Sequence, residues 1–565
     1  MTAALWAPYA SSVDVVVGTQ RHPAQRDDRG WFTAAVHPAH GETYGFVVDG
    51  RDPRPDPRGC WLPDGVHLPG RWYDHAGFGW TDDGWSATPW EQAVVYELHI
   101  GTFTDEGTFD GAVEHLPDLA DLGVTHVEIM PVSAFDGTDG WGYDGVAPWS
   151  VHEPYGGPDG LKRFVDAAHA HGLAVVVDVV HNHLGPSGNY LADYGPYFTD
   201  RVTTPWGDAV NLDGPGSDQV REWLLGSVAA WLVDFHADGV RLDAVHELHD
   251  GRALTFLEEV AALVDRLADE QGRPLVCVAE SDRNDPRTVL PRPDGLGMTA
   301  QWDDDVHHAL HVWLTGEAQG YYADFAADAS QALRSVFAGA FFHTGTFSSF
   351  RGRVHGRAVD TAVLDGTRFV ASLQTHDQVG NRAQGDRLTH LVPTQRLAAG
   401  AALLLLGPFV PMLFMGEEWA ASTRWQFFTS FPDEELAQAV SDGRRSEFGD
   451  HGWAAADVPD PQDPQTVETS RLRWGERSVE PHASMLAWYR TLLRLRAGEP
   501  DLRDPSLPVE LTADADQVTM RRGPLTVRAW LTGEQRTPGE DDEVVASYPG
   551  AVLVTRPTTG TPAHG

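Results

Sequence analysis

The fold follows from the stretch Leu173-Ala-Val-Val-Val-Asp178-Val-Val-His181-Asn182-His183. Its apolar part is almost entirely valine, which is typical of a strand buried on both faces of a parallel sheet, and polar residues begin where that strand should end. Three later stretches repeat the design, and each brings a carboxylate to the end of an apolar run: Gly239-Val-Arg241-Leu-Asp243, Leu275-Val-Cys-Val-Ala-Glu280 and Phe369-Val-Ala-Ser-Leu-Gln-Thr-His376-Asp377.

Helical patterns separate these strands, as expected for a parallel sheet with crossover helices. The sequence predicts eight strands, at 94–100, 125–130, 174–180, 239–242, 275–279, 299–302, 369–373 and 410–414. The crossover helices are predicted to include 110–122, 161–171, 217–235, 252–268 and 395–405. The fold class is therefore α/β, a (β/α)8 TIM barrel, in which all strands end at one face and chemistry collects there.

The first segment of the chain lacks this alternation. Residues 1–90 are rich in Trp, Gly, Pro and Asp and carry alternating strand patterns at 12–17 and near 44–48. We therefore predict an N-terminal β-sandwich that resembles a carbohydrate-binding module. The Pro-rich segment 52–70 is predicted to be an ordered connection without a strand.

The barrel domain is predicted to span residues 91–498, with two excursions that lack the strand–helix alternation. The first excursion, at 184–216, follows the third strand. The second, at 417–480, follows the eighth strand and is predicted to hold a short helix at 433–440. Residues 499–565 show strand patterns and turns, so we predict a C-terminal β-domain there.

Charge and composition exclude several classes of partner. The chain has 565 residues with 41 Lys and Arg against 82 Asp and Glu, a formal net charge of −41. This charge disfavours nucleic acid and anionic membranes and suits a neutral substrate. The sequence shows no apolar tract long enough to span a membrane, no secretory signal and only two cysteines, so we expect a cytoplasmic protein.

Two residue types argue against particular chemistries. Lys162 is the only lysine and lies in an amphipathic helical pattern, so it is predicted on the surface and a Schiff-base role is disfavoured. Cys277 lies inside a predicted core strand, where an inert buried thiol is expected. No cofactor is predicted.

The carboxylates suit the hydrolysis of a glycosidic bond, which needs one acid to protonate the leaving oxygen and one carboxylate across the anomeric carbon. Asp243 and Glu280 are the natural pair. Arg241 shares a strand face with Asp243 and would keep it ionised as a nucleophile. Burial would raise the pKa of Glu280 and keep its proton available. Asp377, beside His376, is predicted to bind sugar hydroxyls and support the transition state.

Further residues near these strand ends are predicted to contact sugar. Trp141, Trp206 and Trp419 are aromatic candidates, and stacking on sugar and packing within loops are both open for them. The full set of predicted substrate-binding residues is Tyr143, Asp178, His183, Arg241, Leu242, Ala244, Val245, His246, Glu247, Asp303, Asp304, Asp305, His307, His308, His376, Gln378, Val379, Gly380, Asn381, Glu417 and Trp419.

The cluster Asp303-Asp304-Asp305-Val-His307-His308 looks like a metal site in composition. Because it directly follows the sixth predicted strand, contacts with substrate hydroxyls are favoured over a metal site or a helix cap. No metal is therefore predicted.

The four stretches resemble the conserved regions of the α-amylase superfamily of retaining glycoside hydrolases. Within it, the chain is similar to the malto-oligosyltrehalose trehalohydrolases in Gly140-Trp-Gly-Tyr143-Asp-Gly-Val146, Tyr155-Gly-Gly-Pro-Asp-Gly-Leu-Lys162, Met415-Gly-Glu-Glu-Trp419 and Gln426-Phe-Phe-Thr429. The resemblance covers essentially the whole chain. Thr375 and Asp303 depart from it, because many relatives carry Asn at both positions.

The resemblance implies that Asp243 is the nucleophile, Glu280 the general acid/base and Asp377 the transition-state stabiliser. The implied substrate is a maltooligosyltrehalose, cut at the α-1,4 bond beside its terminal trehalose unit. A glucan branching or debranching enzyme and a non-catalytic glucan-binding protein are the alternatives. Truncating Asp305 or Gln378 is expected to weaken action on the trehalose-bearing substrate more than on plain maltooligosaccharide.

Overall fold

Eight parallel strands close into a barrel in the computed structural model, which describes residues 3–449, 458–533, 537–539 and 541–558. The strands follow chain order around the barrel: β8 (Val95–Leu98), β9 (His126–Ile129), β10 (Ala174–Val179), β13 (Gly239–Leu242), β14 (Val276–Ala279), β15 (Ala300–Trp302), β18 (Phe369–Ser372) and β19 (Val410–Phe414). The predicted barrel and its eight strands are confirmed, with strand ends shifted by at most two residues.

The barrel interior changes from apolar to polar along the strands. Val95, Val176 and Val278 belong to one buried cluster inside the barrel. Two residues further along the same strands, β8 carries Glu97 and β10 carries Asp178, which point to the same side because side chains alternate with period two. The carboxyl end of the barrel is therefore lined with charged side chains, and its other end is a packed apolar core.

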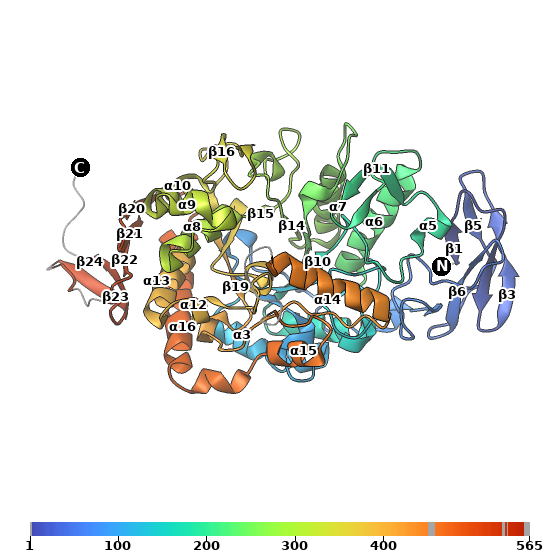
Figure 1. The fold of residues 1–565 in the computed structure, drawn as a ribbon, viewed down its shortest axis with the longest axis horizontal. Helices are drawn as coiled ribbons and strands as arrows, with labels where there is room; N and C mark the ends of the chain where they lie inside the picture. Colours follow the sequence, from blue (N-terminus) through green and yellow to red (C-terminus); the bar gives the residue numbers. More distant parts are fainter. Residues whose placement is uncertain (1–2, 450–457, 534–536, 540, 559–565) are drawn as a thin grey trace.

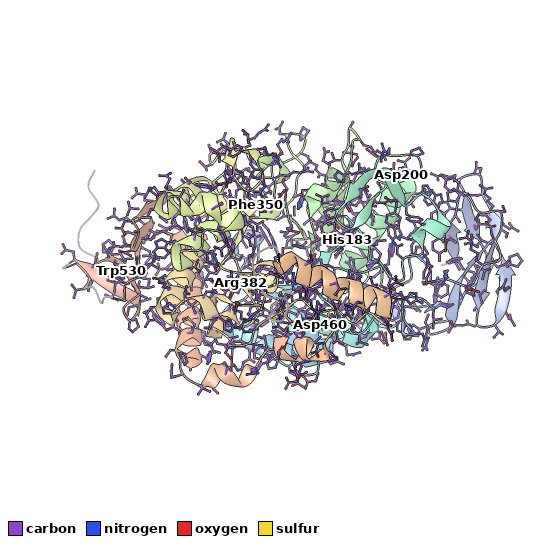
Figure 2. All side chains as sticks on the ribbon, viewed as in Figure 1. His183, Asp200, Phe350, Arg382, Asp460 and Trp530 are labelled. Atoms are coloured by element: carbon purple, nitrogen blue, oxygen red, sulfur yellow. The ribbon has the colours of Figure 1, made fainter. Side chains whose placement is uncertain are left out.

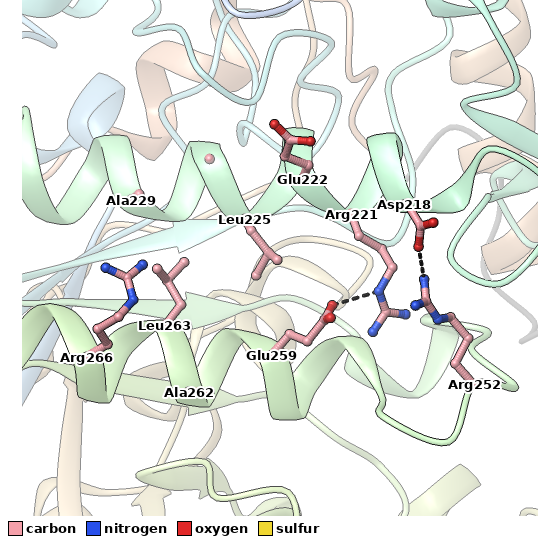
Figure 3. A pocket seen from close by; sticks show the side chains of 11 residues that line it. Asp218, Arg221, Glu222, Leu225, Ala229, Arg252, Glu259, Ala262, Leu263 and Arg266 are labelled. Atoms are coloured by element: carbon pink, nitrogen blue, oxygen red, sulfur yellow. Dashed lines mark hydrogen bonds and ion pairs between the residues drawn. The ribbon is translucent and has the colours of Figure 1, made fainter. Parts of the chain in front are cut away.

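Helices surround the barrel (Figure 1). The longer ones are α4 (Gly157–Ala170), α6 (Ser217–Val233), α7 (Phe256–Gln271), α8 (Asp304–Thr315), α10 (Ala329–Gly339), α13 (Thr394–Leu405) and α16 (His482–Gly498). Figure 3 shows α6 beside α7 across an outer groove, where Arg221 Nε donates to Glu259 Oε2 at 2.7 Å.

Most predicted crossover helices are present, and one is divided. The stretch predicted as a single helix at 110–122 forms α2 (Phe109–Val113) and α3 (Leu116–Leu122). Pro117 lies in the first turn of α3, where its missing N–H and fixed φ are tolerated, whereas they would break the interior of one continuous helix.

The predicted surface position of Lys162 is wrong. Its side chain is buried on α4, and its Nζ donates to the carbonyl of His75 at 3.1 Å. The ammonium lies 5.3 Å from the ring centroid of Tyr73 and 5.6 Å from that of Trp80. Because the connection before the barrel lays these rings over α4, burial lowers the pKa of Lys162 and the aromatic faces stabilise its charge.

Smaller sheets flank the barrel and lie at opposite ends of the molecule (Figure 1). The N-terminal sheets contain β1 (Ala4–Trp6), β2 (Val13–Val17), β3 (Gln20–Pro23), β4 (Gln25–Arg26), β5 (Trp31–Thr33), β6 (Thr43–Val48) and β7 (Gly70–Arg71). The C-terminal sheet contains β20 (Val509–Ala513), β21 (Gln517–Arg522), β22 (Leu525–Trp530), β23 (Asp542–Tyr548) and β24 (Val552–Pro557). The predicted division into three domains stays a prediction, and its last residues, 559–565, lie outside the described part.

Loop excursions carry structure of their own. The first holds α5 (Leu191–Tyr194) and the hairpin of β11 (Phe198–Thr204) and β12 (Gly207–Val210). The second holds α14 (Glu434–Gly449), which is longer than the predicted 433–440, and α15 (Pro464–Ser470), while its residues 450–457 lie outside the described part. Between β15 and β18 the chain adds an unpredicted hairpin, β16 (Thr346–Ser348) and β17 (Arg353–His355). Within the described residues, none of the helices has the length and apolar character that crossing a membrane requires.

Candidate active site

One buried guanidinium joins carboxylates from three barrel strands. Arg241 Nη1 donates to Asp178 Oδ2 at 2.8 Å and to Asp243 Oδ1 at 3.0 Å. Its Nη2 lies 3.0 Å from Glu280 Oε2 in an ion pair. The guanidinium centre sits 4.1 Å from the ring centroid of Trp302 on the next strand. Because Arg241 is fully buried, it fixes the three acids around itself and offsets part of their mutual repulsion.

Asp243 is held from two sides at the mouth of the barrel. Asn182 Nδ2 donates to Asp243 Oδ2 at 2.7 Å and to the Asp243 carbonyl at 2.8 Å. With Arg241 on its other oxygen, the carboxylate has little rotational freedom, yet its side chain keeps 12% exposure toward solvent. Asn182 was missing from the predicted site, although it stands one residue before the predicted His183.

Glu280 is placed to hold a proton. Its Oε2 accepts from the backbone N of Ala244 at 2.7 Å, and Ala244 adopts the left-handed conformation with φ 39° and ψ 53°. Burial raises the pKa of Glu280, the nearby Arg241 lowers it in part, and the negative charge of Asp243 raises it again. A carboxyl with a raised pKa beside a second carboxylate is the combination that general-acid chemistry uses.

Asp377 and His376 begin the short helix α11 (His376–Gly380), which follows β18. Thr375 caps this helix, because its Oγ1 accepts from the backbone N of Asp377 at 3.2 Å while Gln378 Oε1 accepts from the backbone N of Thr375 at 2.8 Å. The threonine that departs from the resembled family thus serves as a helix cap. Gln378 Oε1 is engaged in this capping box, and the predicted sugar contact of Gln378 stays a prediction.

Asp178 supports the floor of the site. Tyr143 Oη donates to Asp178 Oδ2 at 2.7 Å, and the Tyr143 ring lies over the His376 ring with centroids 5.1 Å apart. Burial raises the pKa of Asp178 to about 7, although Arg241 opposes the rise. These groups offer a flat aromatic face beside hydrogen-bonding atoms, which suits a sugar ring.

Two of the three tryptophan candidates, Trp141 and Trp206, differ in exposure. Trp141 is buried against Trp425 with centroids 4.5 Å apart. Trp206 stacks on His183 at 4.4 Å with an interplanar angle of 10°, while half of its surface stays exposed. Trp206 therefore keeps an aromatic face open beside the site.

The predicted sugar contacts of Glu417 and Trp419 are corrected by the structure. Both side chains are buried in η8 (Glu417–Trp419), where Tyr489 Oη on α16 donates to Glu417 Oε1 at 3.1 Å and Trp419 packs 5.0 Å from Trp474. The chain turns back at Ala420, with φ 55°. The two residues therefore pack the barrel against α16.

Three apolar residues of the predicted substrate-binding set lie in the hydrophobic core. Leu242, Val245 and Val379 are buried side chains of the main hydrophobic cluster, so their predicted sugar contacts are corrected. Gly380 offers only its backbone, and its carbonyl accepts from Arg444 Nη2 at 2.6 Å. The polar Asn381 does reach the site, since its Nδ2 donates to Asp377 Oδ1 at 3.3 Å.

The cluster after β15 is largely a helix start. Asp303 is the N-cap of α8, and its Oδ1 accepts from the backbone N of Val306 at 3.3 Å. His307 is buried with its Nε2 3.1 Å from Tyr322 Oη. The helix cap, which the sequence disfavoured, is the observed role of Asp303. Within the described residues no group of His, Cys, Asp and Glu is arranged to hold a metal ion.

Asp305 ties two loops together. Its Oδ2 accepts from Asn284 Nδ2 at 2.7 Å and from the backbone N atoms of Phe342 at 2.8 Å and His343 at 3.0 Å. We expect Asp305→Ala to leave these donors unpaired and to lower the free energy of unfolding by about 1–3 kcal/mol or more, measured by urea unfolding. A matched change at Asp304 should cost less, since Asp304 is only half-buried. A loss of activity on one substrate only, with unchanged stability, would contradict this role.

Asp304 remains as a fourth acid near the reacting groups. Burial raises its pKa to about 8, and the negative charges of Glu280 and Asp377 add to the rise. His308, four residues on, stacks on the half-buried ring of Tyr321 with centroids 4.7 Å apart. The charges of Glu280 and Asp377 therefore act on Asp304, as expected for an acid that lies near them.

His246 and Glu247 lie on η4 (Val245–Glu247), the short helix directly after Asp243. Glu247 Oε2 is 3.2 Å from His249 Nε2, and the His246 carbonyl accepts from Arg283 Nη2 at 2.6 Å. The structure thus keeps both beside the strand end that carries Asp243.

The unpredicted β16–β17 hairpin contacts the loop that follows Glu280. Arg351 Nη2 lies 3.2 Å from Asp282 Oδ2, two residues beyond Glu280, and Phe350 is 58% exposed. Figure 2 labels Phe350 on this hairpin, His183 after β10 and Arg382 after α11.

Comparisons with known proteins find relatives over most of the chain. The family model "Alpha amylase, catalytic domain" matches residues 68–199. The malto-oligosyltrehalose trehalohydrolase of Arthrobacter ramosus is 54% identical over 93% of this chain and 92% of its own length. That of Rhizobium sp. (strain M-11) is 52% identical over 88% of this chain and 85% of its own length. The crystal structure of a putative α-amylase from Salmonella typhimurium matches with a TM-score of 0.90 and 38% identity, covering 99% of this chain and 97% of that one.

Proposed function

The chain belongs to the malto-oligosyltrehalose trehalohydrolases of the α-amylase superfamily, and from that premise we propose that Asp243, Glu280 and Asp377 carry out its reaction. The protein is a glycoside hydrolase that cleaves the α-1,4 bond between a maltooligosaccharide and a terminal trehalose unit. The observation that carries the residue assignment is the single Arg241 guanidinium, which touches Asp243 on one nitrogen and Glu280 on the other.

In the first step Asp243 attacks the anomeric carbon while Glu280 gives its proton to the glycosidic oxygen. The bond to the trehalose unit breaks, trehalose leaves with the proton, and a covalent glycosyl–Asp243 ester forms. Arg241 and Asn182 hold both oxygens of Asp243, so the attacking carboxylate is oriented before substrate arrives. Glu280 supplies the proton because burial and Asp243 raise its pKa.

In the second step Glu280, now ionised, takes a proton from water, and the water oxygen attacks the anomeric carbon. The ester to Asp243 breaks and the maltooligosaccharide leaves with retained configuration. Asp377 is proposed to hold the sugar hydroxyls as positive charge develops on the ring. Its side chain is 40% exposed, which suits a group that contacts substrate.

We further propose that the sugar ring beside Asp243 is held by the groups around it. Tyr143 offers an aromatic face, and Asp178, His183, Arg241 and His376 offer hydrogen-bonding atoms. A neutral glucan suits the net charge of −41, which would repel anionic partners. We place the reaction in the cytoplasm, which keeps the two free cysteines, Cys60 and Cys277, reduced.

A branching enzyme would use the same carboxylates but would pass the glycosyl group to a sugar hydroxyl instead of water. Identity above 50% to named trehalohydrolases over most of the chain favours hydrolysis. A glucan-binding protein without activity is disfavoured by the retained acids and by the ordered partners of Asp243.

The products of one incubation test this function. With maltotriosyltrehalose, the protein is expected to release trehalose and maltotriose in equal amounts, measured by chromatography. Amylose serves as the control, and no branch points should appear in it. Branched products from amylose, or an absence of trehalose from maltotriosyltrehalose, would overturn the assignment.

A further inference from the structure

Glu97 on β8 is the buried acid that the proposed reaction leaves unused. It is fully enclosed in the barrel interior and comes from the first barrel strand, which β9 and β10 separate from the strand of Arg241. Its two oxygens both face His376, since Oε2 accepts from the backbone N of His376 at 3.0 Å and Oε1 lies 2.5 Å from His376 Nδ1. A single carboxylate thus fixes the backbone and the ring of the residue before Asp377.

The two contacts with Glu97 determine which nitrogen atoms of the His376 ring carry a hydrogen. A carboxylate oxygen only accepts, so Nδ1 of His376 must carry a hydrogen toward Glu97. Nε2 lies 3.5 Å from Asp377 Oδ1. If the ring were neutral, Nε2 would present a lone pair toward that carboxylate. If the ring is an imidazolium, Nε2 carries a hydrogen and attracts it.

We propose that Glu97 is a positioning residue that keeps His376 positively charged, so that the Nε2–H of His376 orients Asp377 and keeps it ionised during the reaction. The inference rests on the proposed role of Asp377. It adds a second ion pair to the site, Glu97 with His376, beside that of Arg241 with Asp243.

The surrounding charges decide the protonation of the ring. Burial alone would lower the pKa of His376, but Glu97 and then Asp377 raise it to about 9. Conversely, burial raises the pKa of Asp377, and His376 is the main group that lowers it. The other titratable groups that face the His376 ring are His99, Glu128, Tyr143, Asp178 and Arg241. Of these, Arg241 opposes the charge on His376.

Glu128 on β9 provides a matched control. It lies directly across from Glu97 in the strand register, and it is equally buried. Its Oε1 has no hydrogen-bond partner, and burial raises its pKa well above the usual range. A neutral carboxylic acid exchanged for a neutral amide changes no charge, so Glu128→Gln should leave the ionisation of His376 as it is.

The test measures kcat/KM for α-maltosyl fluoride as a function of pH. Fluoride leaves without a proton, so kcat/KM for this substrate does not require the proton of Glu280, and the alkaline loss through Glu280 is removed from the profile. Wild type should lose activity as pH rises through about 9, where His376 loses its proton. For Glu97→Gln this alkaline limb should move down by about one to three pH units, the effect of removing an adjacent opposite charge. Glu128→Gln should keep the wild-type limb.

Several outcomes would overturn the proposal. The alkaline limb of Glu97→Gln could stay at the wild-type pH, or kcat/KM of Glu97→Gln could fall by the same factor at every pH. Glu128→Gln could also shift the limb as far as Glu97→Gln does. If Glu97→Gln does not fold, the same measurement is made on His376→Gln. The loss of kcat/KM near pH 9 must then be absent from that variant. A wild-type protein that releases no trehalose from maltotriosyltrehalose would instead refute the proposed function, so the two failures are distinguishable.

Discussion

Asp243→Ala is expected to lower kcat for maltotriosyltrehalose by about 10⁴-fold or more, the scale on which loss of a covalent nucleophile acts. Folding should persist, because Arg241 keeps Asp178 and Glu280 as partners and Asn182 keeps the carbonyl of residue 243. Trehalose release measures the activity, and the thermal unfolding midpoint measures the fold. A loss of activity with a retained midpoint identifies a chemical role.

Azide makes this test specific for a nucleophile. The methyl group of the variant leaves space on the face that Asp243 occupied, so azide can attack the anomeric carbon of α-maltosyl fluoride there. The carbon–fluorine bond breaks, fluoride leaves, and the product is a β-maltosyl azide with inverted configuration. Asp218→Ala, on the outer groove beside Arg252, is the matched control and should behave as wild type (Figure 3). Substantial hydrolysis by Asp243→Ala without azide would refute the nucleophile assignment.

The strand ends were predictable because a barrel imposes one rule on every strand. A valine-rich run must be buried on both faces, so the first charged residue after it lies at the mouth, as Asp243 and Glu280 do. The period of two then placed Arg241 beside Asp243, and the structure shows that contact at 3.0 Å. At these positions the local sequence pattern and the barrel fold predict the same residues, so the sequence alone is enough to identify them.

Residues whose role depends on long-range packing were not predictable. The helical pattern around Lys162 predicts a surface residue. It carries no information on the preceding connection, whose aromatic residues cover the Lys162 side chain. Asp305 looks like a sugar ligand because the two loops that it ties lie 21 and 37 residues away. Glu417 is enclosed only because α16 returns from the end of the barrel domain. In each case the partner is distant in sequence and leaves no local trace.

Glu97 lies between these cases. Its strand, Val95–Leu98, is short and otherwise apolar, and a charged residue in a buried strand must have a partner. That signal was present, as it was for Glu128 on the neighbouring strand. The partner, His376, lies 279 residues away, so it could not be predicted from the sequence. A buried acid in a barrel strand thus indicates a supporting position without saying what it supports.

Glu280→Gln is expected to separate the two steps of the reaction. With maltotriosyltrehalose, kcat/KM should fall by about 10²–10⁴-fold, the usual contribution of a general acid, because the trehalose oxygen leaves without a proton. With α-maltosyl fluoride the first step should survive, so kcat/KM should change far less. The second step still lacks its base, so the glycosyl ester on Asp243 should accumulate and give a burst of fluoride, measured by stopped flow or by mass spectrometry of the intact protein.

The pH profile supplies an independent check on Glu280. An acid must be protonated to act, and burial with Asp243 raises the pKa of Glu280, so wild-type activity on maltotriosyltrehalose is lost as pH rises through that raised pKa. Glutamine does not titrate, and Glu280→Gln should therefore lose the part of the alkaline limb that Glu280 contributes. Glu222→Gln, on the exposed outer side of α6, is the control and should keep it. Equal losses on the fluoride and on maltotriosyltrehalose would mean that Glu280 does not donate the proton, and the acid would then have to be sought at Asp304, whose pKa is raised to about 8 by burial, Glu280 and Asp377.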